Sequence, residues 1–177
     1  SGYTLASLTA GSNVTITPGA GTITIAATTG GSSFNYVTFT RRVTSSAPSI
    51  SAPANPFNST TYPSTTYSGI DTASGFTAAN GRFTVPYAGY YRVSALLQLS
   101  AGGGVSDIVI QIRKNGSPIY SCLQFRAPFT VANEQPIAVE ITDQASVSDF
   151  YEIYFSVATN TPSLAVGSSF SIQRIQA

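Results

Sequence analysis

The acidic side chains are the first candidates for chemistry, because the chain contains no histidine. Its absence excludes Ser-His-Asp and Cys-His catalysis, imidazole metal ligands and an imidazole pH switch. A carboxylate pair for glycoside hydrolysis needs two acids about 5–10 Å apart in a groove. Glu140 and Asp143 are close in sequence, but they lie at the end of an expected strand, where solvated turn acids are the usual case. We therefore expect a protein that is not an enzyme.

Metal and thiol chemistry rests on very few residues. Asp143 and Asp149, with loop carbonyls, would offer calcium the oxygen ligands it takes. We favour two solvated turn acids instead, and expect no cofactor and no metal. The single cysteine, Cys122, excludes an internal disulfide and a CxxC zinc site. It lies in an apolar run at 119–125, where a free cysteine packs as a small core residue.

Charge and hydropathy limit the kinds of partner that the protein can bind. The formal net charge is +1 and only 8% of the 177 residues are charged, so there is no basic field for nucleic acid. Arg41 and Arg42 form a two-residue basic spot that is typical of a solvated strand end. No run of 18 apolar residues exists, so we expect no membrane insertion. The chain does not begin with methionine, which indicates a processed chain or a fragment.

The elements that position these residues are expected to be strands. β-Branched and aromatic residues dominate, and clusters of Gly, Pro, Ser and Asn separate them. Apolar alternation puts Tyr91, Val93, Ala95 and Leu97 on one face of a strand. The dipeptide at 115–116, Asn-Gly, is the strongest hairpin signal in the chain. Eight to ten strands at this spacing predict an all-β sandwich, jelly roll or small barrel. Strands are expected near 36–43, 81–85, 90–99, 107–114, 119–125, 137–141, 150–157 and 170–175.

The first thirty residues form a separate module. Two short alternating strands at 14–17 and 22–25 flank a Pro-Gly turn, which predicts a hairpin. An isolated hairpin is marginal in water, so this one needs a partner. A flexible break at 28–33 sets the boundary. We expect a β-hairpin stalk or collar at 1–31 and a globular head at 32–177.

A long segment at 44–66 has little periodicity and is rich in Ser, Thr, Pro and Asn. Loops of this length are usually functional or exchange between subunits. Tyrosine among small polar residues makes an adaptable binding surface. We therefore select Asn58, Tyr62 and Tyr67 as a candidate receptor-binding loop, with a loop that binds nothing as the alternative.

Several motifs in chain order resemble the complement C1q and tumour-necrosis-factor superfamily. They are a Gly-Phe strand start at Gly75 and Phe76, the run Asn-Gly-Arg-Phe-Thr-Val-Pro at 80–86, and Gly-Tyr-Tyr at 89–91. The basic Asn-Gly hairpin at 112–116 and the strands at 137–141, 151–155 and 170–172 follow. The resemblance covers 34–177 and implies a ten-strand, C1q/TNF-like jelly-roll sandwich that assembles as a homotrimer. The usual Gly-Asp is Ser148-Asp149 here, which departs from the family's calcium-ligand pattern.

The resemblance also implies which residues meet at the three-fold axis. It assigns the strands starting at Tyr36, Tyr90, Phe150 and Phe170 to one inner sheet, and Arg92 is then expected near Glu152. Tyr, Phe and Arg are enriched at interface cores and Lys is depleted, and the chain has one lysine. The alternative is an ordinary strand with a few exposed aromatics. The expected trimer-interface residues are Tyr90, Arg92, Leu96, Phe150, Glu152 and Tyr154.

The hairpin at 8–25 resembles those of bacteriophage tail and head fibres. Together with a C1q-like head, it favours a non-enzymatic trimeric fibre or spike head on the virion surface. Its partners would be other virion structural proteins and a host-surface glycan or protein. Two alternatives stay open. One is a purely structural capsid decoration or bacterial surface-filament tip. Near 164–175 the chain also resembles the C1q-like heads of bacterial exosporium filaments. The other is a secreted lectin or carbohydrate-active enzyme.

Overall fold

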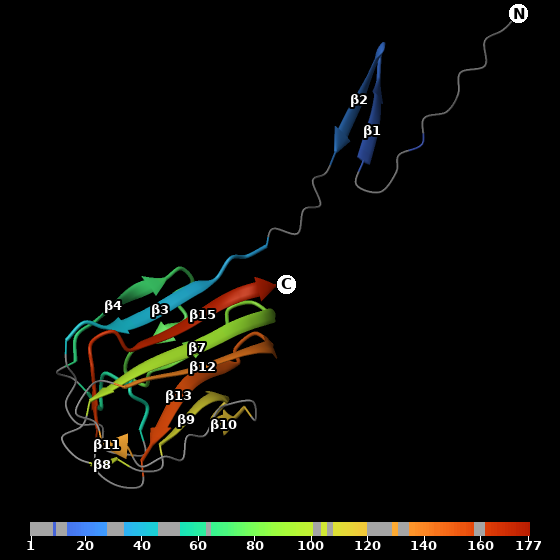
Figure 1. Cartoon of the computed structure of the whole chain (residues 1–177). Coiled ribbons are helices and arrows are strands. Elements are labelled where there is room, and N and C mark those ends of the chain that lie inside the picture. The colour runs from blue at the N-terminus through green and yellow to red at the C-terminus, as the bar shows by residue number, and fades with distance from the viewer. Residues whose placement is uncertain are drawn as a thin grey trace, which may run out of the picture. The chain divides into compact units, whose positions relative to one another are not determined.

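The computed structural model describes residues 9, 14–27, 34–45, 54–62, 65–100, 104–105, 108–119, 129–130, 135–157 and 162–177. The chain divides into two compact units, Ser1–Phe34 and Asn35–Ala177. All regular elements among the described residues are β-strands (Figure 1). In this part of the chain no helix is present that could cross a lipid bilayer. The all-β class expected from the sequence is confirmed.

The first unit contains the expected hairpin. Strands β1 (Val14–Gly19) and β2 (Thr22–Ala27) pair antiparallel, with Ile16 opposite Ile25. Gly21 has φ +79°, a left-handed conformation that glycine adopts without steric cost. Ile23 and Ile25 remain exposed within the hairpin. The first unit ends after Phe34, three residues later than the division expected from the sequence.

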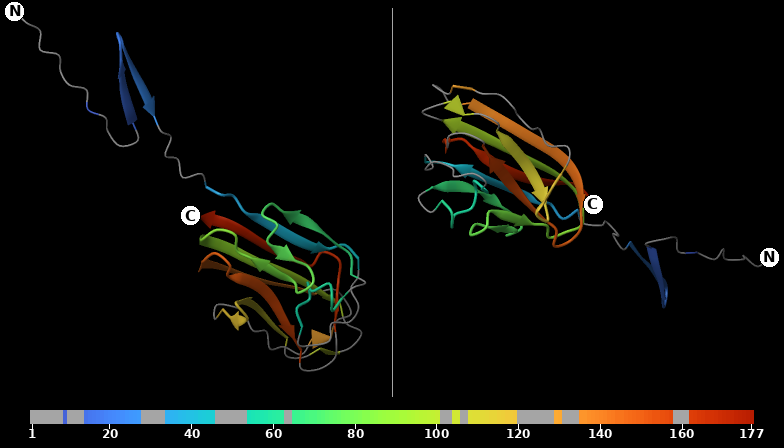
Figure 2. Two further views of the ribbon diagram at one scale, coloured as in Figure 1. Left: turned by 180° about the vertical axis from the view of Figure 1, so that it is seen from behind. Right: turned by 90° about the horizontal axis from the view of Figure 1, so that it is seen from below.

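The second unit is a sandwich of two antiparallel sheets (Figures 1 and 2). The six-stranded sheet follows the order β12-β7-β15-β3-β4, with β14 also pairing with β7. Its strands are β3 (Thr38–Val43), β4 (Tyr67–Asp71), β7 (Gly89–Ser100), β12 (Gln135–Ala145), β14 (Ser163–Leu164) and β15 (Ser169–Gln176).

The five-stranded sheet follows the order β10-β9-β13-β6-β5. Its strands are β5 (Phe76–Thr77), β6 (Arg82–Thr84), β9 (Val109–Lys114), β10 (Ser117–Pro118) and β13 (Phe150–Ser156). A short pair, β8 (Gly104–Val105) with β11 (Phe129–Thr130), lies apart from both sheets in the strand pairing. Asn115 and Gly116, both at positive φ, form the expected turn between β9 and β10.

One expectation about the sheets is wrong. The strand that starts at Phe150 is not in the sheet of the strand that starts at Tyr90, because β13 pairs with β9 and β6. The neighbours of β7 are β12 along eleven residue pairs, β15, and β14 at one end. Alternation within a strand tells which residues share a face, but it carries no information on which strand lies alongside.

The core lies between the sheets and follows the expected alternation. Tyr91, Val93, Ala95 and Leu97 of β7 are buried and face the buried side chains of β13, which include Ile153. This confirms the core face expected for β7. An aromatic cluster fills one end of the sandwich, with the Phe39 ring centroid 4.7 Å from that of Phe76, 5.1 Å from Phe83 and 5.3 Å from Phe170.

Removing a ring from this cluster tests the packing. We expect Phe170→Ala to lower the free energy of unfolding by about 3–5 kcal/mol, because it leaves a cavity among rings that cannot collapse. The matched control is Val147→Ala, at an exposed turn residue, where a loss below about 0.5 kcal/mol is expected. Urea unfolding at one fixed protein concentration measures both. Equal midpoints for the two variants would contradict the assignment of the core.

Candidate functional site

The outer face of the six-stranded sheet is the candidate functional surface. The strand register puts Thr40, Ser171, Ser94 and Glu140 in one row across β3, β15, β7 and β12. Three of these side chains are small, and the hydroxyls of Thr40 and Ser171 are 3.2 Å apart. Thr40, Ser171 and Ser94 line a shallow hollow of about 260 Å³, whose lining also includes Arg92. The centre of this face can therefore be approached closely by another surface.

The charges on this face pair with each other. The Arg92 guanidinium donates to the Glu140 carboxylate at 2.7 Å, and both side chains are about half exposed. The hydrogen bond and the attraction of Glu140 raise the pKa of Arg92. The expected proximity of Arg92 and Glu152 is therefore wrong. Glu152 lies on β13 in the other sheet, where it accepts a hydrogen bond from Arg82 Nε at 2.9 Å.

The six expected interface residues divide between two faces. Tyr90, Arg92 and Leu96 alternate with the buried residues of β7 and share the outer face of the six-stranded sheet. The other three are on β13 in the five-stranded sheet. There, the Arg82 guanidinium lies over the Phe150 ring at 4.4 Å, and Arg113 lies over Tyr154 at 3.4 Å. Phe150, Glu152 and Tyr154 therefore cannot form one surface with the residues of β7.

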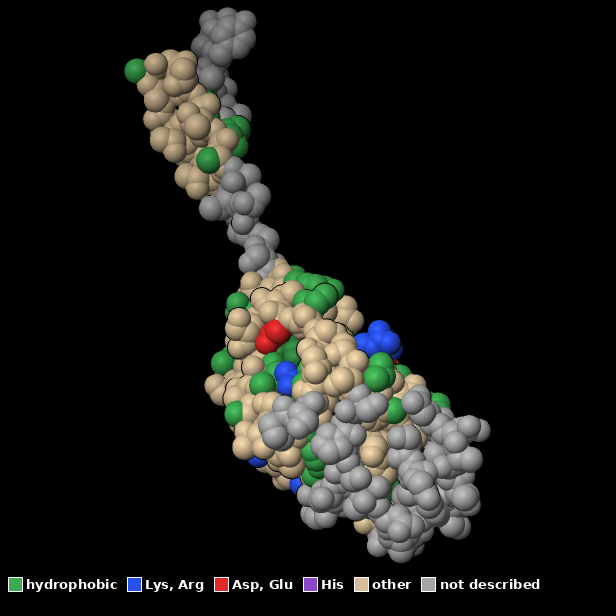
Figure 3. Space-filling model, turned by 90° about the vertical axis from the view of Figure 1, so that its left-hand side faces the viewer, with side chains coloured by type: hydrophobic (Ala, Val, Ile, Leu, Met, Phe, Trp, Pro, Cys, Tyr) green, Lys and Arg blue, Asp and Glu red, His purple; other side chains and the backbone are tan. Residues whose placement is uncertain are grey.

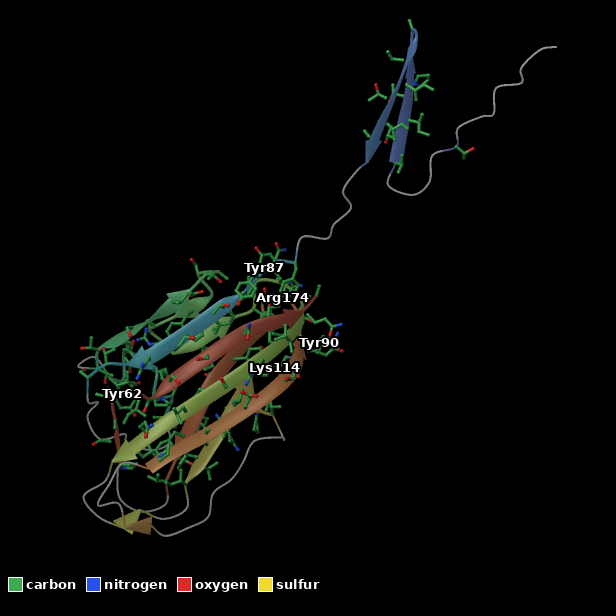
Figure 4. All side chains as sticks on the ribbon, turned by 45° about the horizontal axis from the view of Figure 1, so that its top comes forward. Tyr62, Tyr87, Tyr90, Lys114 and Arg174 are labelled. Atoms are coloured by element: carbon green, nitrogen blue, oxygen red, sulfur yellow. The ribbon has the colours of Figure 1, made fainter. Side chains whose placement is uncertain are left out.

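One end of the six-stranded sheet exposes aromatic and aliphatic side chains. Tyr90 is partly exposed, and Tyr36 and Ile175 are exposed by 59% and 47%. The Tyr36 hydroxyl lies 3.4 Å from Gln173 Nε2 on β15. Figure 4 shows Tyr87, Tyr90 and Arg174 together at this end, and Tyr62 at the opposite one.

Arg174 is a residue that the sequence reasoning missed. It is buried, and its guanidinium donates to the carbonyls of Asn35 at 3.0 Å and Ala88 at 2.5 Å. These bonds tie the end of β15 to the segments before β3 and β7. Alternation along the strand could have predicted its burial, because Phe170, Ile172 and then Arg174 occupy the inward positions of β15.

One residue of the candidate receptor loop, Tyr62, is corrected. Tyr62 is only 4% exposed, and burial raises the pKa of its hydroxyl to about 12, with a further contribution from Tyr67. The Tyr67 ring is half-buried, and its hydroxyl donates to the Pro56 carbonyl at 3.1 Å. Asn58 Oδ1 accepts from the backbone of Thr60 at 2.8 Å, which caps a local turn. Tyr62 therefore belongs to the core and not to a receptor surface, because a large ring is worth burying even within a polar segment.

The two acids considered for calcium converge on a lysine. Lys114 Nζ lies 3.0 Å from Asp143 Oδ2 and 3.4 Å from Asp149 Oδ2, and it donates to the Gln144 carbonyl at 2.5 Å. Asp143 also accepts from the Tyr151 hydroxyl at 2.7 Å. The ammonium thus supplies the positive charge that these carboxylates need. Among the described residues, no group of three or more His, Cys, Asp or Glu side chains is placed to hold a metal ion.

This cluster shifts the pKa of its members. Burial acts against the charge of Lys114, but the hydrogen bonds and attraction of Asp143 and Asp149 outweigh it and raise the pKa. The Asn115 side-chain amide, at 2.8 Å, and the Ser146 backbone lower the pKa of Asp149, and Lys114 adds to this.

Glu140 and Asp143 do not form a catalytic pair. They are three residues apart in β12, and successive side chains of a strand alternate between its faces. Each has its own cation, Arg92 for Glu140 and Lys114 for Asp143. Cys122 lies outside the described residues.

Comparison with known proteins identifies the fold. No family model and no curated protein matches the sequence. The globular domain of zebrafish complement 1qA protein aligns over 76% of this chain and 94% of its own, with a TM-score of 0.52 and 10% identity. The fold is the C1q/TNF-like jelly roll. A second solved structure with this jelly roll, Eiger TNF from S. frugiperda, aligns over 79% of this chain and 92% of its own, with a TM-score of 0.52 and 13% identity.

The Lys114 cluster predicts a specific dependence of stability on pH. A raised lysine pKa means that its stabilisation is complete below the ordinary value of 10.5 and is lost as the pH rises above it. A lowered aspartate pKa means that its stabilisation is complete above 3.8 and is lost as the pH falls below it. We expect Lys114→Gln to lower the free energy of unfolding by about 1–2 kcal/mol at neutral pH, because it leaves two carboxylates without their shared cation.

Urea unfolding from neutral to strongly alkaline pH measures this effect. The difference between wild type and Lys114→Gln should shrink as the pH passes 10.5. The control is Arg113→Gln, which removes one positive charge that has no carboxylate partner within the described ranges. A difference for Lys114→Gln that stays constant with pH, or equals that of Arg113→Gln, would refute the role of the ion pairs.

Proposed function

We propose that the chain is the head of a non-enzymatic homotrimeric virion fibre that attaches to a host-cell surface. The observation that carries the proposal is the outer face of the six-stranded sheet on a C1q/TNF-like jelly roll, since domains with this fold are typically trimeric. This face combines small central side chains with exposed apolar residues at its margins, which include Ile70 on β4 at 62% exposure.

The composition of this face suits self-association about a three-fold axis. Small residues in the central row allow backbones of neighbouring copies to come close, and Tyr36, Tyr90 and Ile175 would lose their exposure to water. The Arg92–Glu140 pair is electrically balanced, so three copies do not repel one another there. Of the six residues expected at the interface, the proposal keeps Tyr90, Arg92 and Leu96.

The attachment role is supported by the surface outside the proposed trimer contact. Among the residues coloured by type on the face seen in Figure 3, few side chains are charged, which suits an exposed part of a rigid particle. A trimer presents three equal sites, and linking them raises the apparent affinity by effective concentration without tight single contacts. The N-terminal hairpin, which has no core of its own, would join the head to the rest of the fibre and to other virion proteins.

Light scattering tests the trimer. We expect about 55 kDa for the full chain, three times its mass of 18.4 kDa, and a trimer also for a chain of residues 32–177. Ser94→Arg places a long charged side chain on the central row and should shift the mass towards a single chain. Thr84→Arg, at an exposed position of the other sheet, should leave the trimer intact. A monomeric wild type, or equal masses for the two variants, would sink the proposed interface.

Deletion of the head tests attachment. Particles whose fibre lacks residues 32–177 should assemble normally and lose adsorption to host cells, and added trimeric head should block adsorption of intact particles. The Ser94→Arg monomer should block about 10²–10⁴ times less effectively, because it lacks multivalency. Failed assembly with unchanged adsorption of the particles that do form would favour a purely structural role and overturn the attachment role.

A further inference from the structure

A second hollow lies at the edge of the sandwich where β3 and β4 face β5. Its volume is about 320 Å³, at the lower end of the range for small-molecule sites. The lining includes Arg41 of β3, Tyr67, Ser68 and Asp71 of β4, and Phe76 of β5. Nothing in the proposed trimer contact or in the Lys114 cluster uses these side chains together.

Arg41 is held in this pocket by aromatic rings. Its guanidinium carbon lies 3.7 Å from the ring centre of Tyr67 and 4.8 Å from that of Phe76. The side chain is half-buried, and its Nε is buried with no hydrogen-bond partner. Burial is the main influence on the pKa of Arg41 and lowers it, against smaller raising contributions from Tyr67. The cation is thus partly removed from water, and the rings compensate it only in part.

No acid in the described part of the chain neutralises Arg41. Glu140 pairs with Arg92, and Glu152 pairs with Arg82. Asp143 and Asp149 share Lys114. Asp71 lines the same pocket, but its oxygens accept from the backbone of Ala73 at 3.1 Å and of Phe76 at 2.8 Å, and it forms no ion pair with Arg41.

We propose that this pocket binds the carboxylate of an acidic sugar residue, of the uronate type. Two aromatic rings lie over the Arg41 guanidinium and its Nε is buried, so an anion would meet the terminal N–H groups, whose planar arrangement matches a carboxylate. The anion supplies the counter-charge that Arg41 lacks within the described residues.

The rest of the pocket favours a sugar over a simple anion. A carboxylate has about four acceptor sites, and two of those of Asp71 are used, so it can still accept from ligand hydroxyls. A ligand with a carboxylate next to hydroxyls therefore complements Arg41 and Asp71 together. This inference rests on the proposed attachment role, to which it adds the chemistry of the receptor.

The test is a titration of the full chain with trigalacturonate, followed by NMR of the arginine Nε–H signals. We expect the Arg41 signal to shift to saturation and the Arg113 signal to stay in place. Neutral maltotriose should move neither. Arg113 is the matched control because it also lies over a tyrosine ring but does not line the pocket.

Variants then separate the site from general charge attraction. Arg41→Gln should weaken trigalacturonate binding by about 10- to 100-fold, because charge-assisted hydrogen bonds are lost. Arg41→Lys keeps the charge without the planar fork and should also bind more weakly. Arg113→Gln should bind as wild type does. If Arg41→Gln does not fold, the wild-type Arg41 signal decides the question alone.

Three results would overturn the inference: an unmoved Arg41 signal, an equal loss in Arg113→Gln, or tighter binding of triglutamate than of trigalacturonate, which would assign the pocket to an acidic peptide. The attachment role fails separately. Saturable binding of trigalacturonate with adsorption that does not depend on the head would support the pocket and refute the fibre role.

Discussion

The structure depends above all on the backbone pairing of β7. This strand of twelve residues pairs with β12 along eleven positions on one side and with β15 on the other. Because side chains alternate with a period of two, a slip of one residue would turn Tyr91, Val93 and Leu97 out of the core. The register therefore determines both surfaces at once: the apolar one that packs on the five-stranded sheet, and the row of small and charged side chains that faces outward.

Charged residues are few in this chain, and their partners differ in kind. The chain has eight basic and seven acidic residues, and the described ones are compensated in different ways. Lys114 stands between two carboxylates at a turn, whereas the terminal nitrogens of buried Arg174 donate to two backbone carbonyls. Arg92 has a carboxylate on an exposed face, where such a pair contributes little to stability. Arg41 has rings but no carboxylate within the described ranges, and unlike Arg113 it lines a pocket.

The sequence predicted those features that depend on neighbours along the chain. Alternation predicted the buried face of β7, and the Asn-Gly dipeptide predicted the turn after β9. It did not give the partner of a strand, and so Arg92 was expected beside Glu152 when it pairs with Glu140. Tyr62 was expected on an exposed polar loop because the segment at 44–66 is rich in polar residues, and composition does not show how much of its area a given side chain buries. The Arg41 pocket could not be predicted at all, because three separate strands form it.

The two proposed sites are connected through β3. Phe39 and Thr40 line both hollows. The next two residues of β3 alternate, so that Arg41 lines the edge pocket and Arg42 is exposed on the other face. Gly69 brings β4 against the Thr40 carbonyl, where a Cβ would collide with the backbone, and so keeps the pocket wall close. Association through the outer face would hold β3 in place in each of three copies. A pocket of this size, open to water and centred on one cation, is suited to weak binding of a single sugar. A trimer would present three such pockets to one repeating acidic glycan. Binding at several pockets at once would raise the apparent affinity, so weak single contacts would suffice for attachment.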